Sequence, residues 1–210
     1  MVLTLTTRTQ FHYLLISFFI LMLSCPVKAQ AWDYIKEKDG IKIYTRVETG
    51  RSLKSYKAVT DMNVPAQKIF TLMEDVNNNA WWDKKLTQIK VLFLDKGKRV
   101  KYYMVYDLPW PVTNRDLCVD VTITDNPVSG ERKVNAVSLN GAIPERNGMV
   151  RIKDYLQSWT ITPAGKEITH IELEGFVDPS GTVPTWISNL LIIESPLKAI
   201  TGLRDAMGKN

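Results

Sequence analysis

The sequence holds few of the residues from which metal centres and hydrolytic triads are built. It contains two histidines and two cysteines among 210 residues. His12 belongs to an N-terminal apolar segment, so His170 stands alone in the rest of the chain. A single histidine excludes a histidine-cluster metal site and argues against a Ser-His-Asp triad. We therefore expect no catalytic residue, no metal and no cofactor.

Runs of five or more lysines and arginines are also missing, although the formal net charge is +5. Basic residues spread evenly along a chain do not favour nucleic acid as a partner. A mildly basic surface is compatible with transient contact with anionic lipid head groups. The length, the hydrophobic fraction of 45% and the absence of repeats and linkers favour one folded domain, which we expect to be a monomer.

The longest apolar run is too short to cross a bilayer. It covers residues 13–23, whereas a spanning helix needs about 20 apolar residues. Arg8 precedes this run and small residues follow it up to Ala29, a pattern typical of a cleavable signal peptide. We predict a signal peptide at residues 1–29, a mature domain at residues 30–210, and export to the periplasm or the cell exterior. Without Arg8 and Lys28, the mature chain has 25 basic and 22 acidic residues, a formal charge of +3.

Two other outcomes at the N-terminus stay open. The segment from Met22 to Cys25 resembles a bacterial lipobox, which would make the mature chain a lipoprotein anchored through Cys25. Alternatively, the apolar segment is retained as a membrane anchor. Cleavage after Ala29 would leave Cys118 without a disulfide partner, and its apolar neighbours indicate a buried, inert thiol.

Hydrophobic periodicity predicts an α+β domain. Alternation with period two, bounded by turn residues, indicates strands at residues 41–47, 53–62, 88–94, 99–106, 115–124, 132–139, 150–162 and 167–177. Helical spacing follows Pro65 and returns from Pro184 to about Met207. Such a sheet must bury one face, and the long last helix can cover it. Pro196 lies inside this helix and predicts a kink or break at residues 192–195.

Four motifs resemble those of a known family. The run at residues 106–116, YDLPWPVTNRD, resembles the Pro-Trp-Pro…Asn-Arg-Asp segment of START lipid-transfer domains, especially bacterial ones. Trp32 with DGIKIY at residues 39–44, Trp81, and DPSGTVPTW at residues 178–186 follow the family order. The resemblance spans Trp32 to Met207. It implies a helix-grip fold, in which a curved antiparallel sheet wraps the C-terminal helix around an internal apolar cavity for a lipid.

One position departs from part of this family. Cholesterol-binding members carry an inward-facing arginine six positions beyond the arginine of the Arg-Asp pair, and that position is Val121 here. The departure favours a more apolar ligand or another polar anchor.

Side chains that face inward from the strands and the last helix are the predicted ligand contacts, since strand residues alternate between faces. The alternative is that the same stripes pack against the helix as solid core. We predict that the ligand-binding residues are Trp81, Tyr102, Met104, Tyr106, Arg115, Leu117, Val119, Val121, Trp159, Ile171, Leu173, Trp186, Leu190, Ile193 and Leu197.

Two of these positions carry open alternatives. Arg115 either contacts a lipid head group or fixes a loop through ion pairs and hydrogen bonds. Trp81 and Trp82 are adjacent, so in a regular element one would pack under the sheet and the other would lie at an entrance or on the surface.

The sequence leaves three functions open. The first is a carrier or sensor that binds a lipid without catalysis. The second is a helix-grip cyclase or aromatase acting on a polyketide-like substrate, whose acid–base candidates are Asp120, Glu172 and Tyr102, with only Tyr102 on a predicted inner face. The third is a structural domain with a filled core and no ligand.

Overall fold

The structure is a computed structural model that describes residues 31–51, 53–79, 81–181, 183–184, 187 and 190–208. The predicted signal peptide lies outside these residues. The described residues from Ala31 onward form one compact unit. None of the helices in this part of the chain is long and apolar enough to span a membrane.

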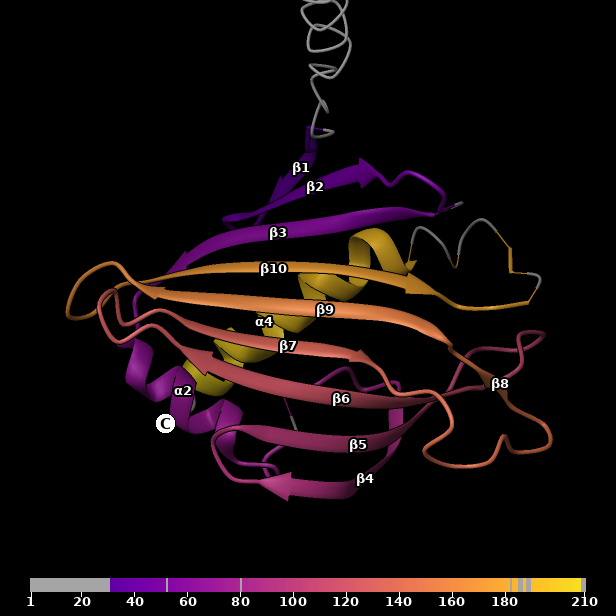
Figure 1. The fold of residues 1–210 in the computed structure, drawn as a ribbon. Helices are drawn as coiled ribbons and strands as arrows, with labels where there is room; N and C mark the ends of the chain where they lie inside the picture. The colour runs from indigo at the N-terminus through magenta and orange to yellow at the C-terminus, as the bar shows by residue number, and fades with distance from the viewer. Residues whose placement is uncertain are drawn as a thin grey trace, which may run out of the picture. The chain divides into compact units, whose positions relative to one another are not determined.

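Ten strands form one curved sheet whose spatial order is β1-β2-β3-β10-β9-β7-β6-β5-β4, with β8 beside β6 (Figure 1). All of these pairings are antiparallel except that of β8 with β6. The strands are β1 Asp33–Lys38, β2 Ile41–Val47, β3 Lys54–Met62, β4 Leu86–Asp95, β5 Arg99–Tyr106, β6 Arg115–Asp125, β7 Arg132–Ser138, β8 Val150–Arg151, β9 Asp154–Pro163 and β10 Thr169–Asp178.

The predicted strands match this sheet with two corrections. β1 was not predicted, because its residues are mostly exposed and charged and therefore lack a clear apolar alternation. The strand predicted at residues 150–162 is two strands. The amides of Val150 and Ile152 donate to carbonyls of the β6 edge, after which the chain crosses to pair with β7 and β10 as β9.

Three described helical segments accompany the sheet: α2 Ala66–Glu74, the π-helix η1 Leu190–Glu194, and α4 Ser195–Gly208. Pro65 stands at the N-cap of α2, where its missing N–H removes no helical hydrogen bond. The change from π-helix to α-helix at Ser195 confirms the break predicted from Pro196, because a proline cannot donate a hydrogen bond to the preceding turn.

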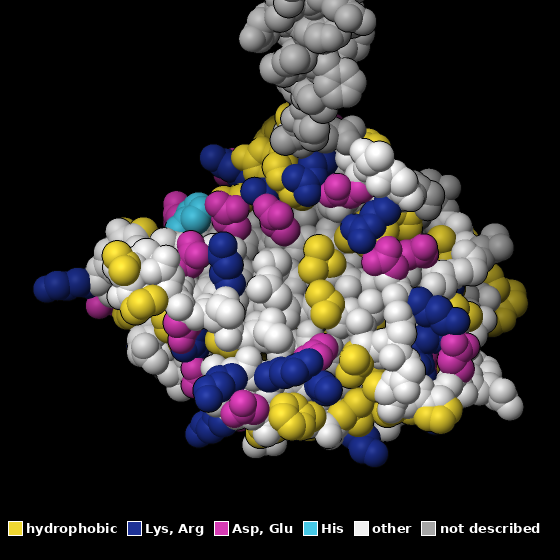
Figure 2. All heavy atoms as spheres, in the orientation of Figure 1, with side chains coloured by type: hydrophobic (Ala, Val, Ile, Leu, Met, Phe, Trp, Pro, Cys, Tyr) yellow, Lys and Arg dark blue, Asp and Glu magenta, His cyan; other side chains and the backbone are white. Residues whose placement is uncertain are grey.

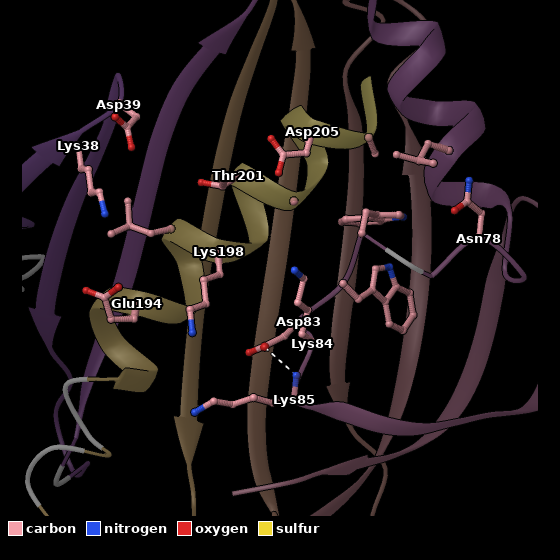
Figure 3. A pocket seen from close by; sticks show the side chains of 16 residues that line it. Lys38, Asp39, Asn78, Asp83, Lys84, Lys85, Glu194, Lys198, Thr201 and Asp205 are labelled. Atoms are coloured by element: carbon pink, nitrogen blue, oxygen red, sulfur yellow. Dashed lines mark hydrogen bonds between the residues drawn. The ribbon is translucent and has the colours of Figure 1, made fainter. Parts of the chain in front are cut away.

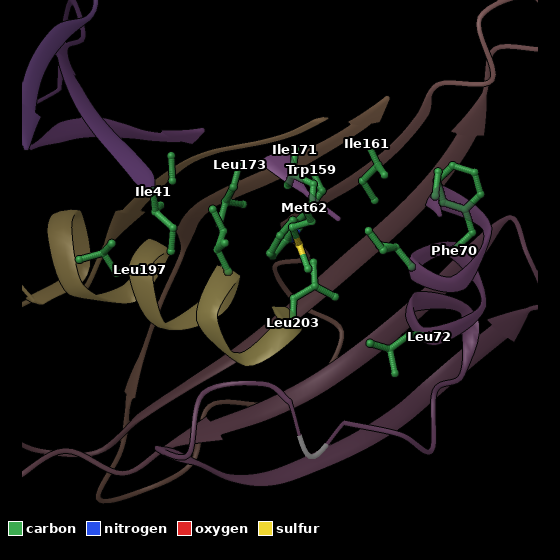
Figure 4. Packing of buried hydrophobic residues seen from close by; sticks show 14 of the residues in the cluster. Ile41, Met62, Phe70, Leu72, Trp159, Ile161, Ile171, Leu173, Leu197 and Leu203 are labelled. Carbon is green, nitrogen blue, oxygen red and sulfur yellow. The ribbon is translucent and has the colours of Figure 1, made fainter. Parts of the chain in front are cut away.

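The main core lies between α4 and the sheet. In Figure 1, α4 runs behind β10, β9 and β7, and we call the face on that side the inner face. Figure 4 shows side chains of the inner face meeting those of both helices. The fully buried members of this cluster are Ile41, Ile43, Ala58, Ile69, Ile161, Ile171, Leu173, Ile200 and Leu203.

The opposite, outer face is largely polar. Positively charged lysines and arginines are interspersed over it with negatively charged aspartates and glutamates (Figure 2). This face also carries a small apolar cluster on β5 and β6, where Tyr103, Val105 and Cys118 pack under Leu139, Ile143 and Met149. The thiol of Cys118 is buried, as predicted, and burial raises its pKa.

Candidate ligand cavity

A cavity of about 160 Å³ lies between the inner face of the sheet and the first turns of α4. Because side chains alternate along a strand, every second residue of β5 and β6 faces it. Ser195 and Ala199 close the cavity from α4. Its strand residues are Leu86 from β4, Val100, Tyr102, Met104 and Tyr106 from β5, Val119, Val121 and Ile123 from β6, Val134 and Ala136 from β7, and Tyr155, Gln157 and Trp159 from β9.

Aromatic rings form a connected wall of this cavity. Trp81 meets Trp82 and Trp159 edge-to-face, with ring centroids 6.0 Å and 6.2 Å apart. Trp82 in turn meets Tyr102 at 5.3 Å. Edge-to-face pairs at these distances are favourable beyond the area that they bury. These ring contacts hold Trp81, Trp82, Trp159 and Tyr102 in fixed orientations along one wall of the cavity.

Trp81 and Trp82 both border the cavity, contrary to the expectation that only one of them would face inward. That expectation assumed a strand or a helix. The chain between α2 and β4 instead runs through turns, with the amide of Trp82 donating to the carbonyl of Asn79. In a turn, adjacent side chains need not diverge, so both indoles reach the same space.

The polar groups of the wall are almost all uncharged. Gln157 accepts a hydrogen bond from the indole of Trp159 and donates one to the hydroxyl of Tyr56, each at 3.3 Å. Among the described residues that line the cavity, Asp83 alone carries a charge. Its carboxylate accepts a hydrogen bond from the amide of Lys85 at 3.0 Å, which ties it to its own turn.

Burial keeps the tyrosine hydroxyls of the cavity protonated. It raises the pKa of Tyr102 to about 12. Burial also raises the pKa of Tyr106, to which the nearby Asp83 carboxylate adds, and it raises the pKa of Tyr155 well above its ordinary value. The cavity therefore offers neutral hydroxyl donors over the whole physiological pH range.

The predicted ligand contacts divide into two groups by position. Seven of them line the cavity: Trp81, Tyr102, Met104, Tyr106, Val119, Val121 and Trp159. Leu117, Ile171, Leu173, Ile193 and Leu197 pack in the apolar clusters and do not line it. Trp186 and the side chain of Leu190 lie outside the described residues.

Arg115 is buried away from the cavity. Its guanidinium donates hydrogen bonds to the backbone carbonyls of Thr113, Pro179 and Ser180. These carbonyls belong to the segments before β6 and after β10, so Arg115 joins two loops at one end of the sheet. This geometry is the loop-fixing alternative considered for Arg115, which is not among the described residues that line the cavity.

Sequence reasoning missed the partner of Asp116 and two of the three cavity residues of β9. The carboxylate of Asp116 accepts two hydrogen bonds from Arg151, at 2.7 Å and 2.9 Å, on the outer face. Arg151 lies 35 positions away, and no local pattern predicts that pair. Tyr155 and Gln157 could have been found, because they stand four and two positions before Trp159 and share its face.

A wider groove of about 860 Å³ borders the same turns from outside (Figure 3). Lys84, Lys85 and Lys198 line it together with Glu194 and Asp205, so its charges are mixed. The segment of Trp81, Trp82 and Asp83, which we call the partition, lines both the groove and the cavity. It is the wall between them.

The backbone of the partition packs directly against α4 at Gly202. A Cβ atom added at Gly202 would lie 2.2 Å from the backbone carbonyl oxygen of Trp81. Only a glycine permits that approach, because any side chain would displace the carbonyl. The indole Nε1 of Trp81 is buried and has no hydrogen-bond partner among the described residues.

A curved antiparallel sheet that wraps a C-terminal helix above an apolar cavity is the helix-grip architecture, and it defines the structural class of this chain. The START domain family matches residues 21–210, and the chain belongs to that family. The family predicted from the motifs at residues 32–44, 81, 106–116 and 178–186 is thus confirmed.

Relatives and solved structures agree with this assignment. An uncharacterized protein of Pseudomonas aeruginosa is 31% identical over 86% of this chain and 89% of its own length. The phosphatidylcholine transfer protein of Rattus norvegicus is 28% identical over 75% of each chain. The structure of a STAR-related lipid transfer protein from Xanthomonas axonopodis has a TM-score of 0.75 at 24% identity, covering 84% of this chain and 98% of that one. It shows the same fold.

Proposed function

We propose that this protein binds one lipid in the cavity beneath α4 and acts as a carrier or sensor without catalysis. The observation that carries the proposal is the cavity itself, which is walled by apolar and aromatic side chains from five strands. Burial of apolar ligand surface there would contribute about 25 cal/mol per Å² before the cost of ordering. The names of the phosphatidylcholine transfer relatives support the same class of ligand.

The acid–base groups of a cyclase are not in the right place among the described residues. Asp120 lies on the outer face with Arg99, and Glu172 lies there with Lys57. Tyr102 does face the cavity, but its pKa of about 12 makes it a poor proton donor or acceptor near neutrality. A filled, ligand-free domain is disfavoured by the cavity. These placements support binding rather than catalysis.

We also propose that the chain is exported, with cleavage after Ala29. The basic start, the apolar run and the small-residue exit support this step. Intact-mass analysis of the protein from its native envelope should show a chain that starts at Gln30. A diacylated Cys25 or an intact Met1 would contradict it.

The binding proposal is tested by native mass spectrometry of the exported protein, followed by extraction and identification of any bound lipid. Val121→Trp fills the cavity and should abolish lipid binding. Thr122→Trp, one position along β6, places the same indole on the exposed outer face and should leave binding unchanged. Equal lipid occupancy in both folded variants would overturn the proposal.

A further inference from the structure

Three tyrosine hydroxyls of the cavity wall have no hydrogen-bond partner among the described residues. Tyr102 and Tyr106 face the cavity from β5, and Tyr155 faces it from β9. None of their hydroxyls forms a hydrogen bond with another described residue, in contrast to Tyr56 and Tyr103, which do. Their side chains border the open space of the cavity rather than solid core, so one polar group of a bound ligand can pair with all three hydroxyls.

The indole of Trp81 adds a fourth donor to the same wall. Its Nε1 is buried without a partner, and its ring borders the cavity. An indole N–H can only donate, and a tyrosine hydroxyl donates as readily as it accepts. The wall thus has several unsatisfied donors, whereas its one side-chain amide, Gln157, is already engaged on both sides.

The charges around these donors limit the ligand group that they can receive. No lysine, arginine or histidine is present among the described lining residues, so an anionic group would enter without a counter-ion. Asp83, at the edge of the cavity, would repel it further. A charge transferred from water into such a site is far costlier than a neutral polar group. An uncharged acceptor suits the donors without that cost.

The small volume of the cavity also limits the part of a lipid that it can hold. A cavity of about 160 Å³ is smaller than the usual range of about 300–1,000 Å³ for ligand pockets. It can hold a small polar group and a few carbon atoms. The rest of a lipid would have to extend past the partition, which is shared with the outer groove.

From these observations we propose that the cavity selects a lipid with an uncharged carbonyl or ester oxygen, which accepts hydrogen bonds from the hydroxyls of Tyr102, Tyr106 and Tyr155. This inference rests on the proposed lipid-binding function and names the chemical class of the buried polar group. It places the acceptor oxygen of the lipid inside the cavity and its hydrocarbon chains toward the partition.

The test compares two matched lipids that differ only in the acceptor. Dioleoylglycerol carries ester carbonyls, and its dioleyl ether counterpart has the same chains and the same hydroxyl without them. Equilibrium binding of each probe to the full-length protein, as its host produces it, is followed by native mass spectrometry. We expect the ester lipid to bind more tightly. Tyr106→Phe and Tyr155→Phe should each weaken ester binding about 2- to 10-fold and so lower the ratio of ester to ether affinity.

Tyr103→Phe is the matched control. Tyr103 lies on the same strand as Tyr102 but on the outer face, where its hydroxyl donates to Asp116 at 3.1 Å. Its loss removes one hydroxyl without touching the cavity, so the ratio of ester to ether affinity should not move. Because this ratio is taken within one variant, a change in the stability of the fold does not affect it.

Each outcome has one interpretation. An ester preference that the cavity variants abolish and Tyr103→Phe retains supports the inference. Equal affinity for both probes in all variants overturns the inference and leaves lipid binding intact. Tighter binding of phosphatidylcholine than of dioleoylglycerol, unchanged by Tyr→Phe, would also overturn it, since the aromatic faces would then be holding the quaternary ammonium. Binding of no lipid by the unaltered protein would overturn the proposed function itself.

Discussion

The inner face of the sheet has one half that α4 fills and one half that it leaves open. On β10, Ile171 and Leu173 are fully buried in the core cluster that contains Leu197 and Leu203 of α4. On β5 and β6, Tyr102 and its neighbours face the cavity instead. α4 contacts β2 and β3 and runs behind β10, β9 and β7, whereas its only residues at the described cavity lining are Ser195 and Ala199. Equivalent apolar stripes thus become core or cavity wall according to the reach of one helix.

The open half depends on a buried ion pair on its reverse side, and breaking that pair should have the largest effect. Asp116→Asn leaves Arg151 buried beside a neutral group, which should cost about 3–5 kcal/mol in the free energy of unfolding. Asp120→Asn is the control on the same strand, since its partner Arg99 is half exposed and the change should cost about 1 kcal/mol or less. Chemical denaturation measures both, and equal costs would contradict the distinction.

Lowering the pH should reduce the difference in the free energy of unfolding between the unaltered protein and Asp116→Asn. Burial raises the pKa of Asp116, but hydrogen bonds from Arg151 and Tyr103 outweigh it, so the pKa is lowered on folding. A carboxyl whose pKa is lowered on folding contributes stability above its unfolded value of about 3.9, and this contribution is lost as the pH falls through the folded value. The stability gap between the unaltered protein and Asp116→Asn should therefore be full at neutral pH and shrink below about pH 4.

Truncation of one side chain in the filled half of the inner face and of one in the open half should lower the free energy of unfolding by different amounts. Leu173→Ala opens a hole in the filled half, where the surrounding side chains cannot collapse, and should cost about 4 kcal/mol. Met104→Ala enlarges a cavity that already exists and should cost about 2 kcal/mol, at the lower end of the range for such truncations. Thermal or urea unfolding would show the order. If Met104→Ala were the costlier change, the cavity half would be packed as tightly as the filled half.

The smallest expected change in stability comes from Gly202, the α4 residue against which the partition packs. Gly202→Ala pushes a methyl group against the carbonyl of Trp81 and should cost about 1–3 kcal/mol, offset in part by better helix propensity. We expect faster exchange of bound lipid, because a displaced partition joins cavity and groove. Gly208→Ala, on the same helix with open space around it, should not change the exchange rate. Lipid transfer between vesicles measures both rates, and identical rates would show that the partition does not limit exchange.

Much of the sheet could be predicted from the sequence, because strand periodicity is local. β5 has the predicted bounds, and its stripe from Val100 to Tyr106 faces inward as expected. The same rule could not separate Leu173 from Val119, since both are apolar and inward-facing and only the position of α4 distinguishes them. Trp82 was misplaced because turns do not alternate. Arg151 was missed because ion pairs between distant segments leave no periodic trace.

The strand order also has a consequence for when the domain can form. β3 pairs with β10, so the first strands of the domain are joined to the rest of the sheet only through its last strand. Lys57 and Glu172, which pair across this junction, are 115 positions apart. Non-local pairing requires the entropy of a long loop to be lost before any contact forms, which makes such topologies slow to fold. During synthesis β1, β2 and β3 can pair with one another, but β3 waits for its second neighbour, β10, until the end of the chain emerges. We expect the sheet to stay in two separate parts, β1–β3 and β4–β9, until β10 is made, so that the complete domain forms only when synthesis is nearly finished.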